Sequence, residues 1–281
     1  MKQPIVYGKI ARSYCCLLSL LLSPLLSAGQ LFDAHMHYNT EDAAYYSPQQ
    51  IIEKLDKSEV RQAAVTSTPP QLAQHLYQHA PERILPLLGI YRNADDKLQW
   101  PQDTSLPTRV KAELEKGGWH GIGELHIFAK DRHSPVLRRI VELAGQYRLP
   151  LLLHTDPAVI DTVYDISPAQ PVIWAHAGTF PYPDLLANYL QRYPALSIDL
   201  SVRDERIAPQ GELLDAWYEL FHTYPDRFLI GVDTYSLGRW HDYAKVVEQI
   251  RQWTEQLPDA TASRLIYENA AAIYSGSNQS R

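Results

Sequence analysis

Short apolar segments recur along the chain and alternate with stretches of helical periodicity. After residue 29 there are eight of them, at Leu31–His37, Val60–Thr66, Ile84–Ile90, His120–Leu125, Leu149–Thr155, Val172–Ala177, Leu196–Ser201 and Phe228–Thr234. Continuous apolar runs of this length, bounded by polar residues, are typical of strands that are buried on both faces of a parallel sheet. We therefore predict eight parallel strands.

The stretches between these strands predict crossover helices. In four of them apolar residues recur at steps of three and four, at Val136–Tyr147, Pro183–Tyr193, Leu213–His222 and Tyr243–Trp253. Strand–helix alternation indicates an α/β fold, and eight repeats in about 250 residues favour a (β/α)8 TIM barrel over an open sheet. No Gly/Ser/Pro-rich linker divides the chain, so we expect a single barrel domain over residues 30–281.

Metal-binding residue types stand at the carboxyl ends of five of the predicted strands. They are His35, His37, Glu124, His154, His176 and Asp233. In a parallel barrel these strand ends meet at one mouth, where barrel enzymes build their active sites. His35 and His37 are two residues apart, so their side chains share one face of the first strand. Because imidazole and carboxylate groups bind divalent metals, we predict a metal site at this mouth.

This ordered set resembles the metal ligands of the amidohydrolase superfamily. The motifs at 176–178 (HAG) and 268–270 (ENA) are similar to its amidohydrolase-related branch (amidohydrolase 2 type) of TIM-barrel, metal-dependent hydrolases. The resemblance implies that His35, His37 and Asp233 hold a more buried ion. It implies that His154 and His176 hold a more exposed one. Glu124 either bridges two ions or contacts a metal ligand without binding the metal itself.

The resemblance also implies hydrolysis by metal-activated water. Bound zinc lowers the pKa of water to about 7, which supplies a hydroxide nucleophile. Asp233 is the predicted catalytic residue, because a carboxylate beside metal and water can take up a proton and pass it to the leaving group. The expected reaction is cleavage of an amide, lactone or other ester bond in a small polar substrate. The expected cofactor is one or two divalent ions, with zinc as first candidate and manganese, iron or cobalt as alternatives.

Three further residues are candidates for substrate binding. Arg132 and Arg203 follow predicted strands, and a planar guanidinium suits a substrate carboxylate or phosphate. Both can equally pair with acidic neighbours in their own loops. His126 lies two residues beyond Glu124, so its side chain either reaches the same pocket or faces solvent.

The first 29 residues have the layout of a secretory signal peptide. Lys2, Lys9 and Arg12 precede an apolar stretch, and small residues at 27–29 offer a cleavage point. Cleavage would remove both cysteines and leave a periplasmic or secreted protein without a stable membrane anchor. An uncleaved N-terminal anchor is the alternative.

The charge of the chain argues against nucleic acid as a partner. The formal net charge is −6, and without the signal 23 basic residues face 32 acidic ones, a net charge of −9. Because neutralisation of phosphates dominates nucleic-acid affinity, an acidic chain without a Lys/Arg cluster is a poor binder. We therefore predict a small-molecule substrate. The sequence leaves the oligomeric state open, a homo-oligomer included.

Two other functions fit the same ligand set. One is a single-metal decarboxylase of the same superfamily, in which Arg203 would hold the substrate carboxylate. The other is a non-catalytic periplasmic barrel that binds a metal or a ligand. Metal content and turnover separate these alternatives from a two-metal hydrolase.

Overall fold

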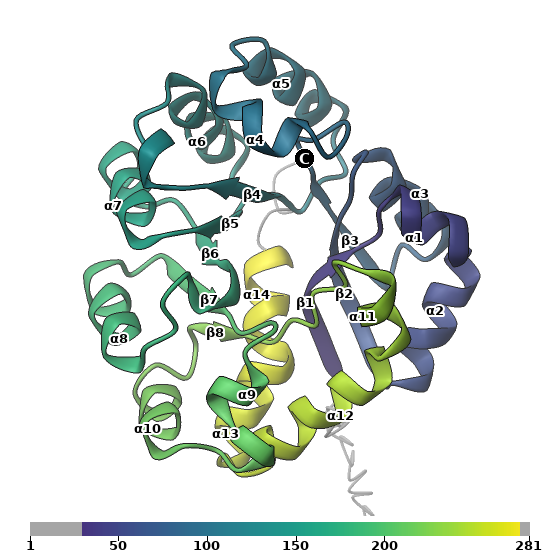
Figure 1. Cartoon of the computed structure of the whole chain (residues 1–281), viewed down its shortest axis with the longest axis vertical. Coiled ribbons are helices and arrows are strands. Elements are labelled where there is room, and N and C mark those ends of the chain that lie inside the picture. The colour runs from purple at the N-terminus through teal and green to yellow at the C-terminus, as the bar shows by residue number, and fades with distance from the viewer. Residues whose placement is uncertain (1–29, 276–281) are drawn as a thin grey trace, which may run out of the picture.

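Eight parallel strands form the centre of the molecule (Figure 1). The computed structural model describes residues 30–275, so the predicted signal peptide and the location it implies lie outside the described residues. The strands are β1 (Leu31–His37), β2 (Val60–Thr66), β3 (Ile84–Leu88), β4 (Gly121–Ile127), β5 (Leu151–Thr155), β6 (Val172–Trp174), β7 (Leu196–Asp199) and β8 (Phe228–Leu229). They are hydrogen-bonded in sequence order from β1 to β8.

The sheet closes on itself between its first and last strands. The backbone N–H of Ala34 in β1 donates to Ile230 O at 2.8 Å, and the N–H of Asp233 donates to His35 O at 2.7 Å. Each partner residue lies just beyond β8, so the segment after β8 continues the ladder against β1. The predicted (β/α)8 barrel is confirmed.

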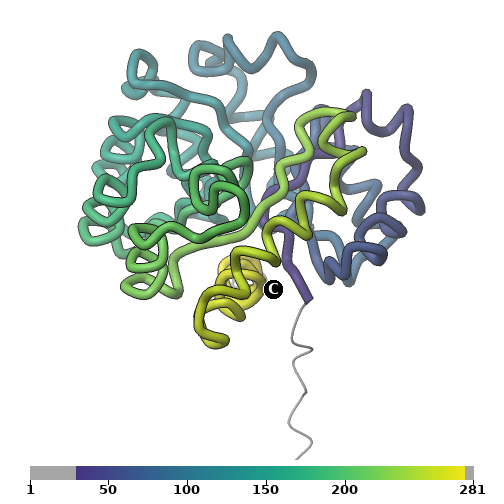
Figure 2. The backbone as a smooth tube through the Cα atoms, turned by 60° about the horizontal axis from the view of Figure 1, so that its bottom comes forward, coloured from purple at the N-terminus to yellow at the C-terminus, as the bar shows by residue number. Residues whose placement is uncertain are grey.

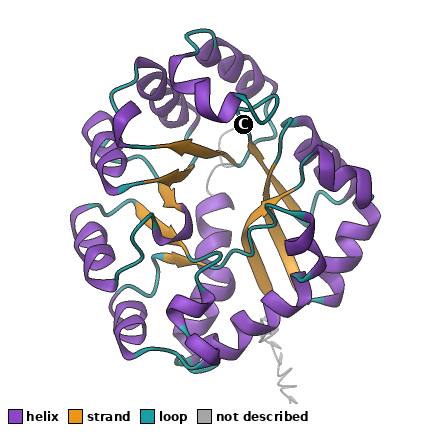
Figure 3. Ribbon diagram, viewed as in Figure 1, coloured by secondary structure: helices purple, strands orange, loops and turns teal. Residues whose placement is uncertain are grey.

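Helices surround the strands (Figure 3). They are α1 (Thr40–Tyr45), α2 (Pro48–Lys57), α3 (Gln71–His79), α4 (Asp96–Gln99), α5 (Leu106–Lys116), α6 (Pro135–Tyr147), α7 (Pro157–Ile166), α8 (Pro183–Arg192), α9 (Asp204–Ile207), α10 (Asp215–Thr223), α11 (Leu237–His241), α12 (Tyr243–Thr254), α13 (Asp259–Ser263) and α14 (Asn269–Ser275). The first residue of α6 follows Ser134, whose side chain accepts hydrogen bonds from the free N–H groups of Val136 and Leu137. The apolar stripe of α6 then packs on the barrel.

The C-terminal helix α14 closes the amino end of the barrel. Tyr274 stacks on Phe32 of β1, with ring centres 5.9 Å apart, and its hydroxyl donates to Ala34 O at 3.1 Å. Ala270 and Tyr274 join a buried apolar cluster inside the barrel together with Leu152 of β5. Figure 2 shows the end of the described chain near the start of β1. The carboxyl-end mouth is therefore left for a functional site.

β1 and β2 have their predicted bounds and the other six strands differ from theirs, and in three of them the difference moves a candidate ligand. β4 runs on to Ile127, so Glu124 lies inside the strand instead of at its end. β6 and β8 stop early, so His176 and Asp233 lie in the turns that follow. The backbone leaves the extended conformation at both residues, because φ is +59° at His176 and +57° at Asp233. Within the described part of the chain, no helix is long and apolar enough to cross a bilayer.

Candidate metal centre

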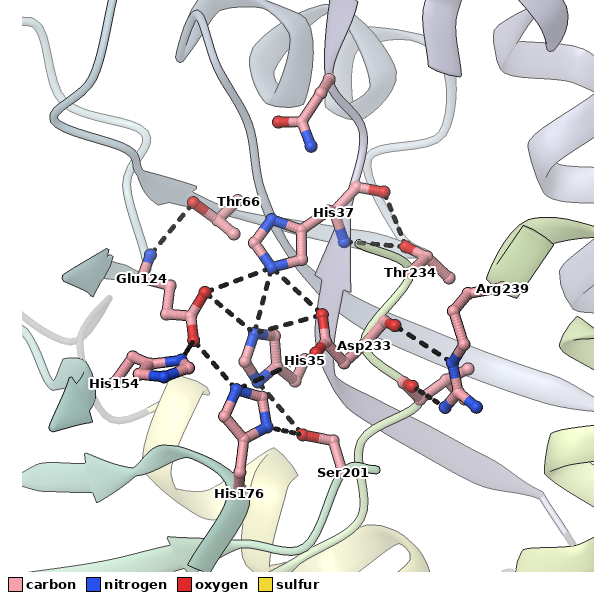
Figure 4. A network of polar contacts seen from close by, with 12 residues as sticks. His35, His37, Thr66, Glu124, His154, His176, Ser201, Asp233, Thr234 and Arg239 are labelled. Carbon is pink, nitrogen blue, oxygen red and sulfur yellow. Dashed lines mark hydrogen bonds and ion pairs between the residues drawn. The ribbon is translucent and has the colours of Figure 1, made fainter. Parts of the chain in front are cut away.

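The six predicted ligands converge at the carboxyl-end mouth of the barrel (Figure 4). They come from β1, β4, β5 and the turns after β6 and β8. All are buried except His154, whose side chain is 37 % exposed. Two ligands about 2.1 Å from one tetrahedral ion lie about 3.4 Å apart, which gives a standard for the distances below.

Glu124 lies at the middle of the cluster, and its two oxygens face different partners. Oε2 is 3.4 Å from His37 Nε2 and 3.7 Å from His35 Nε2. Oε1 is 3.0 Å from His154 Nδ1 and 3.1 Å from His176 Nε2. One carboxylate thus joins an inner group of donor atoms on β1 to an outer group on the opposite side.

Asp233 completes the inner group. Its Oδ1 lies 3.2 Å from His37 Nε2 and 3.9 Å from His35 Nε2. This oxygen is buried, yet it accepts no hydrogen bond from any described residue. A buried carboxylate oxygen without a donor is costly unless a cation satisfies it. The donor set and this orphaned oxygen both fit a divalent metal ion.

Asp199, at the end of β7, is a functional residue that the sequence analysis missed. It is fully buried, and its Oδ2 lies 2.8 Å from His35 Nδ1. The contact requires the proton of His35 on Nδ1, which leaves the Nε2 lone pair directed at Glu124 and Asp233. A single acidic residue inside the apolar run 196–201 was the signal available in the sequence.

Asp199 also orients His176, through Ser201. The Ser201 hydroxyl donates to Asp199 Oδ2 at 2.5 Å and lies 2.9 Å from His176 Nδ1. Because that hydroxyl proton is used, His176 Nδ1–H must donate to Ser201 Oγ. The Nε2 lone pair of His176 then faces Glu124. One buried carboxylate therefore sets the tautomers of two candidate ligands.

Mutual electrostatics keep the two carboxylates of the cluster ionised. Burial by itself raises the pKa of Glu124, but His35, His154 and His176 outweigh it and hold the pKa well below the usual value. Burial likewise raises the pKa of Asp233, and His35 and His37 outweigh it and lower the pKa to about 2. The same carboxylates, against the effect of burial, raise the pKa of His35 well above its usual value. The centre therefore stabilises positive charge, whether a proton or a metal ion carries it.

Two arginines support the turns that carry His176 and Asp233. Arg203 donates to His176 O at 2.7 Å and to Gly178 O at 3.1 Å. Arg239 donates to the carbonyls of Val232 and Asp233. Each guanidinium thus satisfies two backbone carbonyls of these turns. These contacts direct the Arg203 guanidinium at the turn that carries His176.

Of the other predicted substrate contacts, only His126 lines a pocket at the centre. Arg132 donates to Ala129 O at 3.0 Å, within its own loop. The burial of His126 lowers its pKa to about 3, so its imidazole is neutral.

The pocket beside the cluster has a volume of about 350 Å³. The pocket is lined by His37, Glu124 and His126, together with residues at or just after the ends of β1, β2 and β3. Among the latter, Arg92 is paired with Asp96 at 2.9 Å. Lys97 has no ion pair among the described residues, and its ammonium lies 5.9 Å from the centre of the Tyr91 ring.

Comparison with known proteins gives one family. The profile described as TatD related DNase matches residues 32–172, half of the chain. No curated protein matches. Among solved structures, the TatD homologue YJJV from Escherichia coli K12 is 13 % identical, with a TM-score of 0.62 over 88 % of this chain and 99 % of that one. A TatD family hydrolase from Entamoeba histolytica is 14 % identical, with a TM-score of 0.56 over 88 % and 98 %. At these identities the structures support the fold alone.

The matched region contains four of the six candidate ligands, from His35 to His154. The predicted amidohydrolase-related branch and the TatD group are related but different groups of barrel hydrolases, so the prediction is confirmed for the superfamily and not for the branch. The chain belongs to the TatD-related DNase family of metal-dependent hydrolases.

Proposed function

We propose that the chain is a two-metal hydrolase that cleaves a phosphodiester bond at the carboxyl-end mouth of its barrel. The observation that carries this proposal is the position of Glu124, whose two oxygens face two separate groups of donor atoms. The inner ligands would be His35, His37 and Asp233. The outer ones would be His154 and His176. Two bound divalent ions supply activated water and stabilise the attacking and leaving oxygens of such a displacement.

Asp233 is the proposed proton carrier. Its Oδ1 accepts no hydrogen bond among the described residues, and its pKa of about 2, lowered by His35 and His37 against burial, keeps it ionised at neutral pH. A carboxylate in this state can accept a proton from the attacking water and deliver it to the leaving oxygen. Asp199 holds His35 in the required orientation throughout.

The family relationship favours DNA as the source of the phosphodiester. This conflicts in part with the prediction, made from net charge, that nucleic acid is not a partner. Two divalent ions can hold a single phosphodiester without a cluster of basic side chains. The pocket of about 350 Å³ is at the small end of ligand sites, which suits one nucleotide unit at the end of a strand better than a duplex.

A second candidate is the hydrolysis of an amide, lactone or other ester bond in a small polar molecule. The scarcity of available cations favours it, because Arg92 is paired with Asp96 and Arg203 is bound to carbonyls. Among the described residues that line the pocket, Lys97 is the one cation without an ion pair. The metal identity follows the donor types: histidine and carboxylate favour zinc, and they also accept manganese, iron or cobalt.

A substrate panel tests the proposal. The full chain, loaded with zinc or manganese, is assayed on bis(p-nitrophenyl) phosphate, single-stranded DNA, p-nitrophenyl acetate, a lactone and an anilide. We expect turnover of the phosphodiesters, abolished by a chelator and reduced at least about 100-fold in Asp233→Asn. Turnover of the carboxylic substrates alone would establish the second candidate. Loss of carbon dioxide from a carboxylic acid would establish a decarboxylase, and a metal-loaded chain with no turnover would refute both.

A further inference from the structure

The pocket beside the metal centre is lined by hydrogen-bond donors as well as by candidate metal ligands. The side chains of Lys97, Asn39 and Asn93 line the same cavity of about 350 Å³ as His37 and Glu124. A molecule bound in this cavity can therefore contact the metal centre and these three side chains at the same time.

Lys97 supplies the available positive charge of this cavity. It has no ion pair among the described residues, and its ammonium lies 5.9 Å from the centre of the Tyr91 ring. Arg92 also lines the cavity, but it is paired with Asp96 at 2.9 Å. Glu41 is a further lining residue, and it is exposed, so water and salt screen its charge. The ammonium of Lys97 is thus free to meet an anionic group of a bound molecule.

Two asparagine amides add donors to the cavity. Asn39 Oδ1 accepts from the backbone N–H of Thr68 at 2.8 Å. Asn93 Oδ1 accepts from the backbone N–H groups of Asp95 and Asp96 at 3.0 and 3.3 Å. These bonds fix which end of each amide is the oxygen, so each NH2 group is a donor. Neither NH2 group has a hydrogen-bond partner among the described residues.

One ammonium and two amide NH2 groups suit an anion that has several oxygen acceptors. Hydrogen bonds between an ammonium and an ionised oxygen are about twice as strong as neutral ones, and lysine is a common phosphate ligand. The proposed substrate offers such an anion, because each nucleotide of a strand adds another phosphate. A cavity that suits one nucleotide unit leaves room for one phosphate beyond the nucleoside.

We propose that Lys97, Asn39 and Asn93 bind a second phosphate of the substrate, one nucleotide away from the phosphodiester at the metal centre. This assignment rests on the proposed function and narrows its substrate to a strand end that carries a terminal phosphate. The nucleoside between the two phosphates would occupy the cavity. The three side chains determine specificity and take no part in breaking the bond.

Two substitutions and a matched control test the assignment. Lys97→Met removes the charge and keeps the length of the side chain. Asn93→Asp keeps an oxygen for the loop N–H groups and replaces the donor by a second acceptor. Lys130→Met is the control, because it removes the same charge from a side chain that is 82 % exposed and does not line the cavity. Circular dichroism and metal content verify that each variant is folded and loaded.

Calorimetric titration measures binding without turnover. The metal-loaded chain is titrated with thymidine 3′,5′-bisphosphate and with each thymidine monophosphate. We expect the wild type and the control to bind the bisphosphate at least about tenfold more tightly than either monophosphate, and both cavity variants to reduce this preference at least about fivefold. The slope of log affinity against log salt should fall by about one in Lys97→Met. An equal preference in all four proteins, or none in the wild type, would overturn the assignment.

Turnover separates this assignment from the proposed function. Thymidine dinucleotides with and without a phosphate at either end are compared as substrates. We expect a phosphate at one end to lower KM in the wild type and the control, and Lys97→Met to abolish this advantage while kcat is kept. Preferential binding of the bisphosphate without cleavage of any phosphodiester would refute the proposed function and keep the assignment. Cleavage that is indifferent to the terminal phosphate would refute the assignment and keep the proposed function.

Discussion

Replacing Asp199 by asparagine keeps the shape of the side chain and removes one buried charge. In the structure its Oδ1 accepts from Ser201 N–H at 3.0 Å. Its Oδ2 accepts from His35 Nδ1 at 2.8 Å, from the Ser201 hydroxyl and from His176 N–H at 3.2 Å. Every partner of the carboxylate is thus a donor. An amide nitrogen in either position meets at least one N–H group that it cannot bond.

The cost follows from these contacts. With the amide nitrogen toward Ser201, one buried N–H loses its acceptor, which costs about 1–3 kcal/mol of stability. With the amide nitrogen toward His35, the proton of that imidazole must move to Nε2 and block the candidate ligand atom. Loss of a partner of this kind typically weakens metal binding 10- to 100-fold, or about 1.4–2.8 kcal/mol. We therefore expect Asp199→Asn to weaken binding of the inner ion through His35, and binding of the outer ion through Ser201 and His176.

Competition with a chromophoric chelator measures this affinity, and urea unfolding of the metal-free protein measures the stability. Asp165→Asn is the control, since it removes the same charge from an exposed position on α7. An inner-ion affinity in Asp199→Asn equal to that of the control would show that Asp199 does not orient His35 for metal binding.

Three other predictions concern Gly231, Tyr274 and Asp233. In Gly231→Ala the new Cβ would lie 2.5 Å from Asp199 Oδ1, so we expect a loss of about 1–3 kcal/mol in urea unfolding together with weaker metal binding. Tyr274→Phe loses one buried hydrogen bond at the opposite end of the barrel; about 1 kcal/mol should be lost in the same assay, with metal affinity unchanged. In the metal-free protein, His35 and His37 outweigh burial and lower the pKa of Asp233 from 3.8 to about 2. Ionised Asp233 should therefore add about 2 kcal/mol to the free energy of unfolding above pH 4. This contribution should disappear as the pH falls through 2. Unfolding curves for Asp233→Asn that keep the wild-type difference between pH 5 and pH 2 would contradict this.

The sequence predicted the barrel well because buried parallel strands are uniformly apolar. β1 and β2 have the predicted bounds, and the four predicted helices agree with α6, α8, α10 and α12 to within a few residues. The strand ends at His176 and Asp233 were not predictable in this way, because a positive φ leaves no trace in an apolar pattern.

The candidate ligands were predictable, but the residues that orient them were less so. Histidine and acidic residues at strand ends are conspicuous in sequence, whereas the role of Asp199 depends on a contact with His35 from 164 positions earlier in the chain. Arg203 was predicted to face substrate, and its guanidinium is instead used by carbonyls at 176 and 178. These contacts join residues far apart in the sequence, so they form only when the barrel has folded.

Among the described residues, α14 fills the amino end of the barrel, so the mouth at the carboxyl end is the open one. Ions and substrate must use the same entrance, since the opposite end is filled by Tyr274 and its apolar neighbours. A molecule bound beside His37 and Glu124 would therefore cover candidate ligands of the metal centre. We therefore expect metal to bind before substrate, and we expect a slowly released product to protect the bound metal from chelators.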